Sequence, residues 1–225
     1  MVNTVTTTLA ADPREVATYD VAEVAHYLRL PPSTVRAWVI GQKEFKSLIR
    51  PASDSSPTLS FVNLVEIHVL AAIRRHHRVP MPKVRLALEN LDLPTAHPLA
   101  DARFQTDGVD LFIRRLDDLV NLSRPTQRTM REVIEAHLHR VVWATDDLPL
   151  ELFPFTTPNL NSRRSVMINP RIAFGRLVIA KTGIPTLTVA QRYLAGDSVD
   201  ELAEDYGRAR IEIEDALRCE FARAA

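Results

Sequence analysis

Ser33, Thr34 and Arg36 stand close together at the start of a short helical pattern, and their side chains suit contacts with nucleic acid. An arginine that enters the major groove binds guanine edges or phosphates, and hydroxyl groups beside a positive helix end donate to phosphate oxygens. Lys43 and Arg50 follow in the chain and carry the charge that a DNA backbone attracts. We therefore predict that these five residues contact DNA.

Arg208 and Arg210 begin the last helical pattern of the chain and suit the same role. A packing module whose arginines are merely solvated explains this second pattern equally well. The sequence therefore leaves open which of the two patterns reads DNA.

Residues that could perform catalysis are few and poorly spaced. The pairs His76–His77 and His137–His139 have no further ligand at a spacing typical of a metal site, and Cys219 lies in an apolar helical pattern. No phosphate-binding loop and no nucleophile-elbow motif occurs, and the chain has only six glycines. We predict that the protein is not an enzyme and binds no metal or cofactor.

Composition limits the class of protein. The chain has 225 residues, 46% of them hydrophobic, with 28 basic and 28 acidic side chains. No apolar run approaches the roughly 20 residues of a membrane span, no secretory signal begins the chain, and the single cysteine excludes an intramolecular disulfide. We expect a cytoplasmic protein with no membrane partner.

The neutral sum conceals a basic stripe. Between Arg29 and Arg85 the chain has ten lysines and arginines against three acidic residues. A local excess of positive charge is what an anionic partner requires, although a solvated basic face remains the alternative.

The elements that would position these residues follow from periodicity and capping signals. Residues 1–18 read as a loose polar tail. Asp20 and Glu23 fit the start of a helix that ends before Pro31, and a second helix runs from about Pro32 to Gly41. Two short helices joined by a tight turn form a helix-turn-helix unit. Strand-like pieces at 47–50 and 58–60 predict a hairpin wing, and helices are predicted over 61–77 and 82–91.

The middle of the chain reads as a small α+β segment. We predict a linker over 92–103, short strands near 104, 111–113 and 119–121 around the turn at 106–108, and a helix over 127–139. A strand is predicted at 141–143 and a second polar linker over 158–164.

The last sixty residues begin with strands at 166–170 and 177–179 and then become helical. Helices are predicted over 187–195, over 199–206 after the capping box of Ser198 and Glu201, and over 209–223 after Gly207. The fold expected is mainly α with short β-hairpins: two helix-turn-helix domains, at 19–93 and 166–225, flank an α+β middle segment at 94–165.

The N-terminal pattern resembles a known DNA-binding family. Residues 19–38 (YDVAEVAHYLRLPPSTVRAW), with residues 59–61 and the helix that follows, resemble the MerR-type winged helix-turn-helix. Ala37 replaces the aromatic residue that usually precedes the tryptophan, and Phe61 replaces the usual tyrosine after the wing. The chain also lacks the long helix through which MerR regulators dimerise.

The C-terminal pattern is similar to a small prokaryotic helix-turn-helix family, long catalogued as a domain of unknown function. The similarity rests on residues 171–185 (RIAFGRLVIAKTGIP), 193–207 (YLAGDSVDELAEDYG) and 213–218 (IEDALR). Members are commonly antitoxins encoded beside a PIN-like ribonuclease toxin. Together, the two halves resemble a long VapB-type antitoxin. The resemblance implies that the protein neutralises the toxin by binding it, represses the shared promoter at its own operator and acts as a homodimer or a larger assembly.

Four arginines are the candidates for toxin contact that this resemblance suggests. Arg163 and Arg164 lie in the second polar linker, and Arg218 and Arg223 lie in the last helix. Their planar guanidinium groups suit the carboxylates of a ribonuclease metal site. Two alternatives remain open: a stand-alone transcriptional regulator without a toxin, and a metal-dependent hydrolase.

Overall fold

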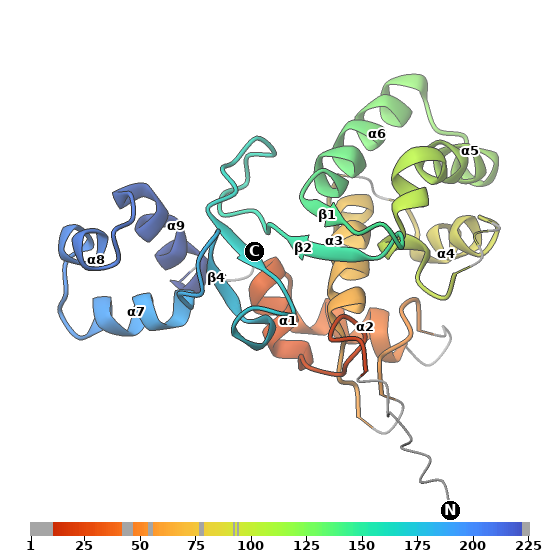
Figure 1. Ribbon diagram of the computed structural model, residues 1–225. Helices are drawn as coiled ribbons and strands as arrows, with labels where there is room; N and C mark the ends of the chain where they lie inside the picture. Colours follow the sequence, from red (N-terminus) through yellow and green to blue (C-terminus); the bar gives the residue numbers. More distant parts are fainter. Residues whose placement is uncertain are drawn as a thin grey trace, which may run out of the picture.

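The computed structural model describes residues 11–41, 47–53, 56–76, 79–91, 93 and 95–221. Over this part the chain is a mixed α+β protein (Figure 1). The N-terminal and middle helices are α1 (Val21–Leu28), α2 (Pro32–Ile40), α3 (Phe61–His76), α4 (Met81–Glu89), α5 (Val109–Val120) and α6 (Arg124–Leu138). Four strands follow α6 in the described chain: β1 (Val141–Trp143), β2 (Pro149–Leu152), β3 (Val166–Ile168) and β4 (Leu177–Ile179). The C-terminal unit, as we call residues 186–221, contains α7 (Thr186–Leu194), α8 (Val199–Asp205) and α9 (Arg210–Phe221).

The predicted N-terminal helix pair is confirmed. The Asp20 side chain accepts a hydrogen bond from the Glu23 backbone N–H and so caps α1. Proline at the first turn begins α2, and Gly41, at φ +86°, ends it. Val24 of α1 and Val35 of α2 are fully buried between the helices and the rest of the core. The turn between them is therefore fixed both by sequence and by packing.

Helix α3 is the central element of the N-terminal and middle parts. Its hydrophobic side chains from Phe61 to Ile73 are almost completely buried, and it packs against α6 and against a short 3₁₀ turn at Pro98–Ala100. Helix α5 packs against both α4 and α6, so that these elements form one end of the molecule (Figure 1).

The four strands form one antiparallel sheet in the order β1-β2-β3-β4. Leu152 of β2 pairs with Ile168 of β3, and Val166 of β3 pairs with Ile179 of β4. The predicted strands at 141–143, 166–170 and 177–179 are thus confirmed. The sheet crosses the predicted segment border at residue 166, and a single large apolar core contains residues from all three predicted folded segments.

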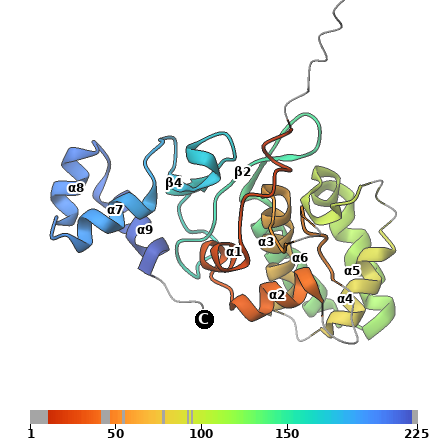
Figure 2. The same ribbon diagram turned by 90° about the horizontal axis from the view of Figure 1, so that it is seen from below.

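The C-terminal unit lies at the other end of the molecule, beyond β4 (Figures 1 and 2). The predicted capping box is present, because Ser198 and Glu201 bond to each other's backbone N–H groups. Gly207 adopts φ +59° in the turn between α8 and α9. Helix α9 packs against both α7 and α8.

Three predictions about the N-terminal and middle parts were wrong. The tail is not loose from residue 11 onward, because Arg14 is buried and forms ion pairs of 2.5 Å with Asp12 and 2.6 Å with Asp146. The segment 95–103 is no linker, since Leu99 and Ala100 are buried against α3. The region predicted as short strands within 102–122 is helical: a π-helical turn at Phe104–Gly108 leads directly into α5.

The predicted wing is also not formed by the residues that the structure describes. Leu59 pairs with Tyr19 instead of with the segment 47–50, and the N–H groups of Leu48 and Ile49 both donate to the carbonyl oxygen of Trp38. The two flanks therefore bind different partners. Residues 42–46 and 54–55 lie outside the described part.

The second predicted linker is irregular in backbone but firmly held. The buried guanidinium of Arg140 donates to the carbonyl oxygens of Phe153, Ser162 and Arg163 at 2.9, 2.7 and 3.1 Å. Its burial lowers the pKa of Arg140 to about 10.

Candidate nucleic-acid interface

Helix α2 places its polar N-terminal half at the surface. Val35, Trp38 and Val39 are buried, whereas Ser33 and Arg36 are exposed. The helix is therefore held by one apolar face and presents the other to solvent. The Arg36 guanidinium has no hydrogen bond or ion pair with any residue that the structure describes.

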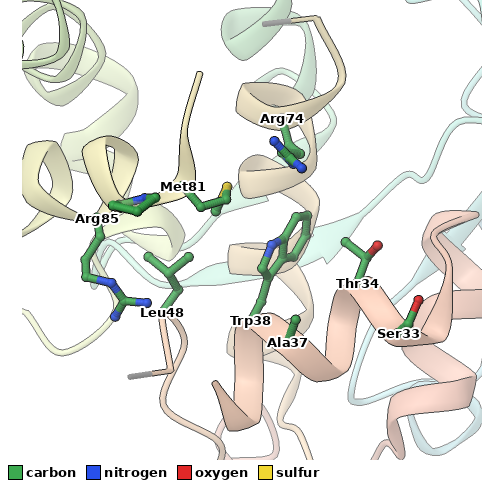
Figure 3. Close-up of a pocket in the computed structure, with 9 residues that line it drawn as sticks. Ser33, Thr34, Ala37, Trp38, Leu48, Arg74, Met81 and Arg85 are labelled. Carbon is green, nitrogen blue, oxygen red and sulfur yellow. The ribbon is translucent and has the colours of Figure 1, made fainter. Parts of the chain in front are cut away.

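A hollow of about 360 Å³ lies beside this helix (Figure 3). Four elements line it, with Ser33, Thr34, Ala37 and Trp38 from α2, Leu48 from the following segment, Arg74 from α3, and Met81, Pro82 and Arg85 from α4. In the close-up the two hydroxyl side chains stand on one side of Trp38 and Arg85 on the other. None of the described lining residues is acidic.

Two cationic residues of this hollow, Arg74 and Arg85, are absent from the DNA contacts predicted from the sequence. Arg74 is exposed at the C-terminal half of α3, and Arg85 donates to the carbonyl oxygen of Ser47 at 2.9 Å. Both belong to the basic stripe, which was the available signal. We call Ser33, Thr34, Arg36, Arg74 and Arg85 the α2 surface.

The remaining N-terminal candidates are not placed on the α2 surface. Lys43 lies outside the described residues. Arg50 is exposed but lines a separate hollow, together with Glu15, Asn63 and His97. Its carbonyl oxygen accepts a hydrogen bond of 2.9 Å from Asn63 Nδ2.

A buried acid–imidazole pair lies at the edge of that second hollow. His97 Nδ1 is 2.9 Å from Glu66 Oε2, and the Glu66 side chain is 5% exposed. Burial raises the pKa of Glu66, and the hydrogen bond to Glu66 raises the pKa of His97. The folded chain therefore binds protons at this pair more tightly than the unfolded chain does.

The C-terminal candidates for DNA contact are occupied by internal acids. Arg208 pairs with Glu212 at 2.5 Å. Arg210 pairs with Asp200 and, at 3.0 Å, with Glu214, and these carboxylates raise its pKa. A guanidinium already bound to carboxylates must lose those bonds before it can bind a phosphate.

The net charge of the C-terminal unit also disfavours DNA binding by this part of the chain. Residues 186–221 contain nine carboxylates and only four arginines. Each of the four arginines, which are Arg192, Arg208, Arg210 and Arg218, has an ion pair within the unit. An excess of negative charge repels the phosphate backbone of DNA.

The proposed toxin contacts are also largely engaged. Arg218 pairs with Asp215 at 2.6 Å and with Glu214 at 3.1 Å. The Arg164 guanidinium donates to the carbonyl oxygen of His139 and lies 5.4 Å from the ring centre of Phe153. Arg163 is exposed, and Arg223 lies outside the described residues.

The described residues offer neither a candidate metal site nor a candidate membrane span. No group of three or more His, Cys, Asp or Glu side chains in this part of the chain could hold a metal ion. None of the helices described is long and apolar enough to cross a membrane.

Comparison with protein families assigns the two ends of the chain differently. Residues 17–88 match a family described as a putative DNA-binding helix-turn-helix domain. Residues 166–219 match a family described as a protein of unknown function, DUF433. The α2 surface therefore lies within the match whose description names DNA binding.

Relatives from Mycobacterium tuberculosis span nearly the whole chain. The putative antitoxin VapB45 is 29% identical, and the alignment covers 90% of this chain and 93% of that protein. The uncharacterized protein Rv2308 is 26% identical, with 91% and 89% covered. The crystal structure of Rv2018 superposes with a TM-score of 0.68 at 27% identity and covers 90% of this chain and 98% of that one. The chain is thus similar over about nine-tenths of its length to a protein named as a putative antitoxin, and its residues 17–88 match a putative DNA-binding helix-turn-helix family.

Proposed function

We propose that the protein is a non-enzymatic, cytoplasmic DNA-binding antitoxin. In this proposal it acts as a homodimer, binds double-stranded DNA at its own operator through the α2 surface and represses its operon. It also neutralises a PIN-like ribonuclease toxin by direct binding. The N-terminal family match and the relative named as a putative antitoxin support this function.

One observation carries the assignment of DNA binding to the α2 surface. Arg36 is exposed on α2 with no partner among the described residues, whereas Arg210, at the first position of α9, is bound by two carboxylates. Binding of DNA by Arg36 costs no existing ion pair. Binding by Arg210 requires the loss of two, next to further unpaired negative charge.

The hollow beside α2 strengthens the assignment. Arg74 and Arg85 line it, and no described acidic side chain does. Phosphate contacts fix the register of a recognition helix, while base contacts provide specificity. Arg74 and Arg85 suit the first role, and Arg36 suits the second.

The test is the salt dependence of binding to the DNA upstream of the gene. Fluorescence anisotropy is measured with the labelled upstream fragment and with a scrambled fragment of equal length as control. If about five phosphates are neutralised, log K falls with log salt with a slope of about −4 to −5. A flat dependence, or equal affinity for both fragments at moderate salt, contradicts the proposal.

A stand-alone transcriptional regulator is the second candidate. It is favoured by the engagement of Arg164 and Arg218, two of the arginines expected to contact a toxin. Both candidates bind the upstream DNA, but only an antitoxin co-purifies with the product of an adjacent reading frame. If no adjacent reading frame encodes such a partner, the stand-alone regulator is the better-supported function.

A further inference from the structure

The C-terminal unit exposes large apolar side chains that its own core does not use. Leu187 is 56% exposed and Leu194 is 73% exposed on α7. They are seven positions apart in the sequence, so both lie on the same face of the helix, two turns apart. Val189 and Ala190, on the adjoining side of the helix, are buried and hold α7 against the rest of the unit. The leucines are therefore not needed to pack α7.

An aromatic pair is exposed roughly a third of a turn around α7 from the two leucines. Tyr193, 43% exposed, precedes Leu194 directly, and its ring centre lies 6.1 Å from that of Phe221 on α9, which is 46% exposed. We call Leu187, Tyr193, Leu194 and Phe221 the α7 face. Large exposed apolar side chains on neighbouring sides of one helix are a feature of protein-binding surfaces, and tyrosine is enriched among the residues that dominate binding energy.

Charge identifies the partner that this face suits. The unit has nine carboxylates against four arginines, and each arginine is already in an internal ion pair. A second copy that docked through the same face would bring two acidic units together, which opposes association. A partner whose apolar patch is bordered by lysine and arginine meets no such repulsion.

We propose that the α7 face binds a protein with an apolar patch and a basic border, and that this protein is the ribonuclease toxin. This proposal rests on the proposed antitoxin function. It replaces arginine contacts to the toxin's acidic metal site with apolar contacts from α7 and α9. Negative charge of the unit then steers the basic partner towards the face.

The test measures binding of the full-length chain to the ribonuclease encoded beside it, inactivated at its metal site, by isothermal titration calorimetry. The double variant Leu187→Gln, Leu194→Gln is expected to weaken the complex about tenfold or more, because two central apolar contacts are lost. The control Thr188→Gln changes an exposed polar position of the same helix and is expected to bind normally. Leu194→Met keeps an apolar side chain and is also expected to bind normally.

Two further readouts separate the possible outcomes. Circular dichroism and binding to the upstream DNA are measured for every variant, and both are expected to remain unchanged. Raising the salt from about 0.05 M to about 0.3 M is expected to weaken the wild-type complex, because charge attraction is screened.

Normal toxin binding by the double variant overturns the proposal that the α7 face binds the toxin, but it does not contradict the antitoxin function. Failure of the wild-type chain to bind the ribonuclease overturns the antitoxin function itself. If sedimentation shows a wild-type dimer that only the double variant loses, the face binds a second copy and the proposal is wrong. If the double variant unfolds, two other measurements test the proposal: the salt dependence of the wild-type complex and the affinity of the single variant Leu194→Gln. A wild-type affinity that does not change with salt, together with normal affinity of Leu194→Gln, overturns the proposal.

Discussion

At the scale of single residues, the difference between the two helix-turn-helix candidates lies in what each arginine already binds. Arg210 is 55% exposed, yet Asp200 and Glu214 hold its guanidinium. The ion pairs within α9 and at its start could be predicted from the sequence, since Glu214 stands four residues after Arg210 and Glu212 four residues after Arg208. The contact to Asp200 could not, because it crosses the turn between α8 and α9.

Substitution of the two arginines separates their roles. Arg36→Ala is expected to weaken binding to the upstream DNA by about 1–3 kcal/mol, because a base or phosphate contact is lost. Arg210→Ala is expected to leave the affinity within about 0.5 kcal/mol, since it removes only exposed ion pairs. Gel-shift titrations of both variants against one fragment measure the difference. The reverse pattern contradicts the assignment of DNA binding to α2.

The Glu66–His97 pair predicts a pH dependence of stability. Both pKa values are raised in the folded chain, so the folded state binds protons more tightly than the unfolded state. The contribution of His97 is therefore complete below the ordinary histidine pKa of about 6.5 and is lost as the pH rises through its raised pKa. The contribution of Glu66 is complete only below the ordinary glutamate pKa of about 4.3 and is lost as the pH rises through its own raised pKa. Urea denaturation between about pH 6 and pH 9 is expected to show a falling free energy of unfolding.

Glu66→Gln is the matched variant for this pH effect. It removes the buried charge but keeps a polar side chain beside Asn63 and His97. We expect a flatter dependence of the unfolding free energy on pH than in the wild-type chain. An equal slope in both proteins would show that other groups cause the pH effect.

At the scale of elements, capping and periodicity predicted most helices, and turn-like sequences misled. Val109, Phe112, Ile113 and Leu116 have helical spacing and are buried in α5, but Thr106, Asp107 and Gly108 resembled a hairpin turn. Gly108 has a different purpose. A Cβ added there would lie 2.7 Å from Phe104 Cδ2, so the position needs a glycine for close packing inside a helical segment.

Pairing between distant segments was the part that local sequence could not predict. The strands around Leu59 were expected to form a wing, but Leu59 pairs with Tyr19. The site was likewise predicted in part. Ser33, Thr34 and Arg36 were found from their helix, whereas Arg74 and Arg85 reach the hollow that Ser33 and Thr34 line only through the packing of α3 and α4.

The turn before β4 provides a test of how the elements are joined. Gly175 adopts φ +76°, and a Cβ there would lie 2.2 Å from Tyr19 Oη, which donates to the Gly175 carbonyl oxygen at 3.0 Å. Gly175→Ala is expected to destabilise the protein by about 2–4 kcal/mol, through left-handed strain and loss of this buried hydrogen bond.

Gly183→Ala is the control for this substitution. No heavy atom lies within 4 Å of a Cβ built there, and its φ is not positive. The control is expected to change the free energy of unfolding by less than about 0.5 kcal/mol. Equal effects of the two changes, measured by urea denaturation, would contradict a specific role for the Tyr19–Gly175 contact.

At the scale of the whole molecule, the C-terminal unit and the segment beside β4 contact α1 and leave α2 exposed. His26 of α1 lies 3.3 Å from Glu220 of α9, and Arg176 beside β4 pairs with Glu23. Both views show α1 next to β4, with α2 on the side away from the C-terminal unit (Figures 1 and 2). The molecule can therefore present α2 to DNA and the α7 face to a protein partner at the same time.

The most direct test of this division is hydrogen exchange of the full-length chain, free and bound to its upstream DNA fragment. The structure predicts that bound DNA slows amide exchange in residues 32–41 and in the part of α3 around Arg74. Exchange in α8 and α9 is expected to remain unchanged. Protection confined to residues 199–221, with none in α2, would show that the C-terminal unit reads DNA and would contradict the account.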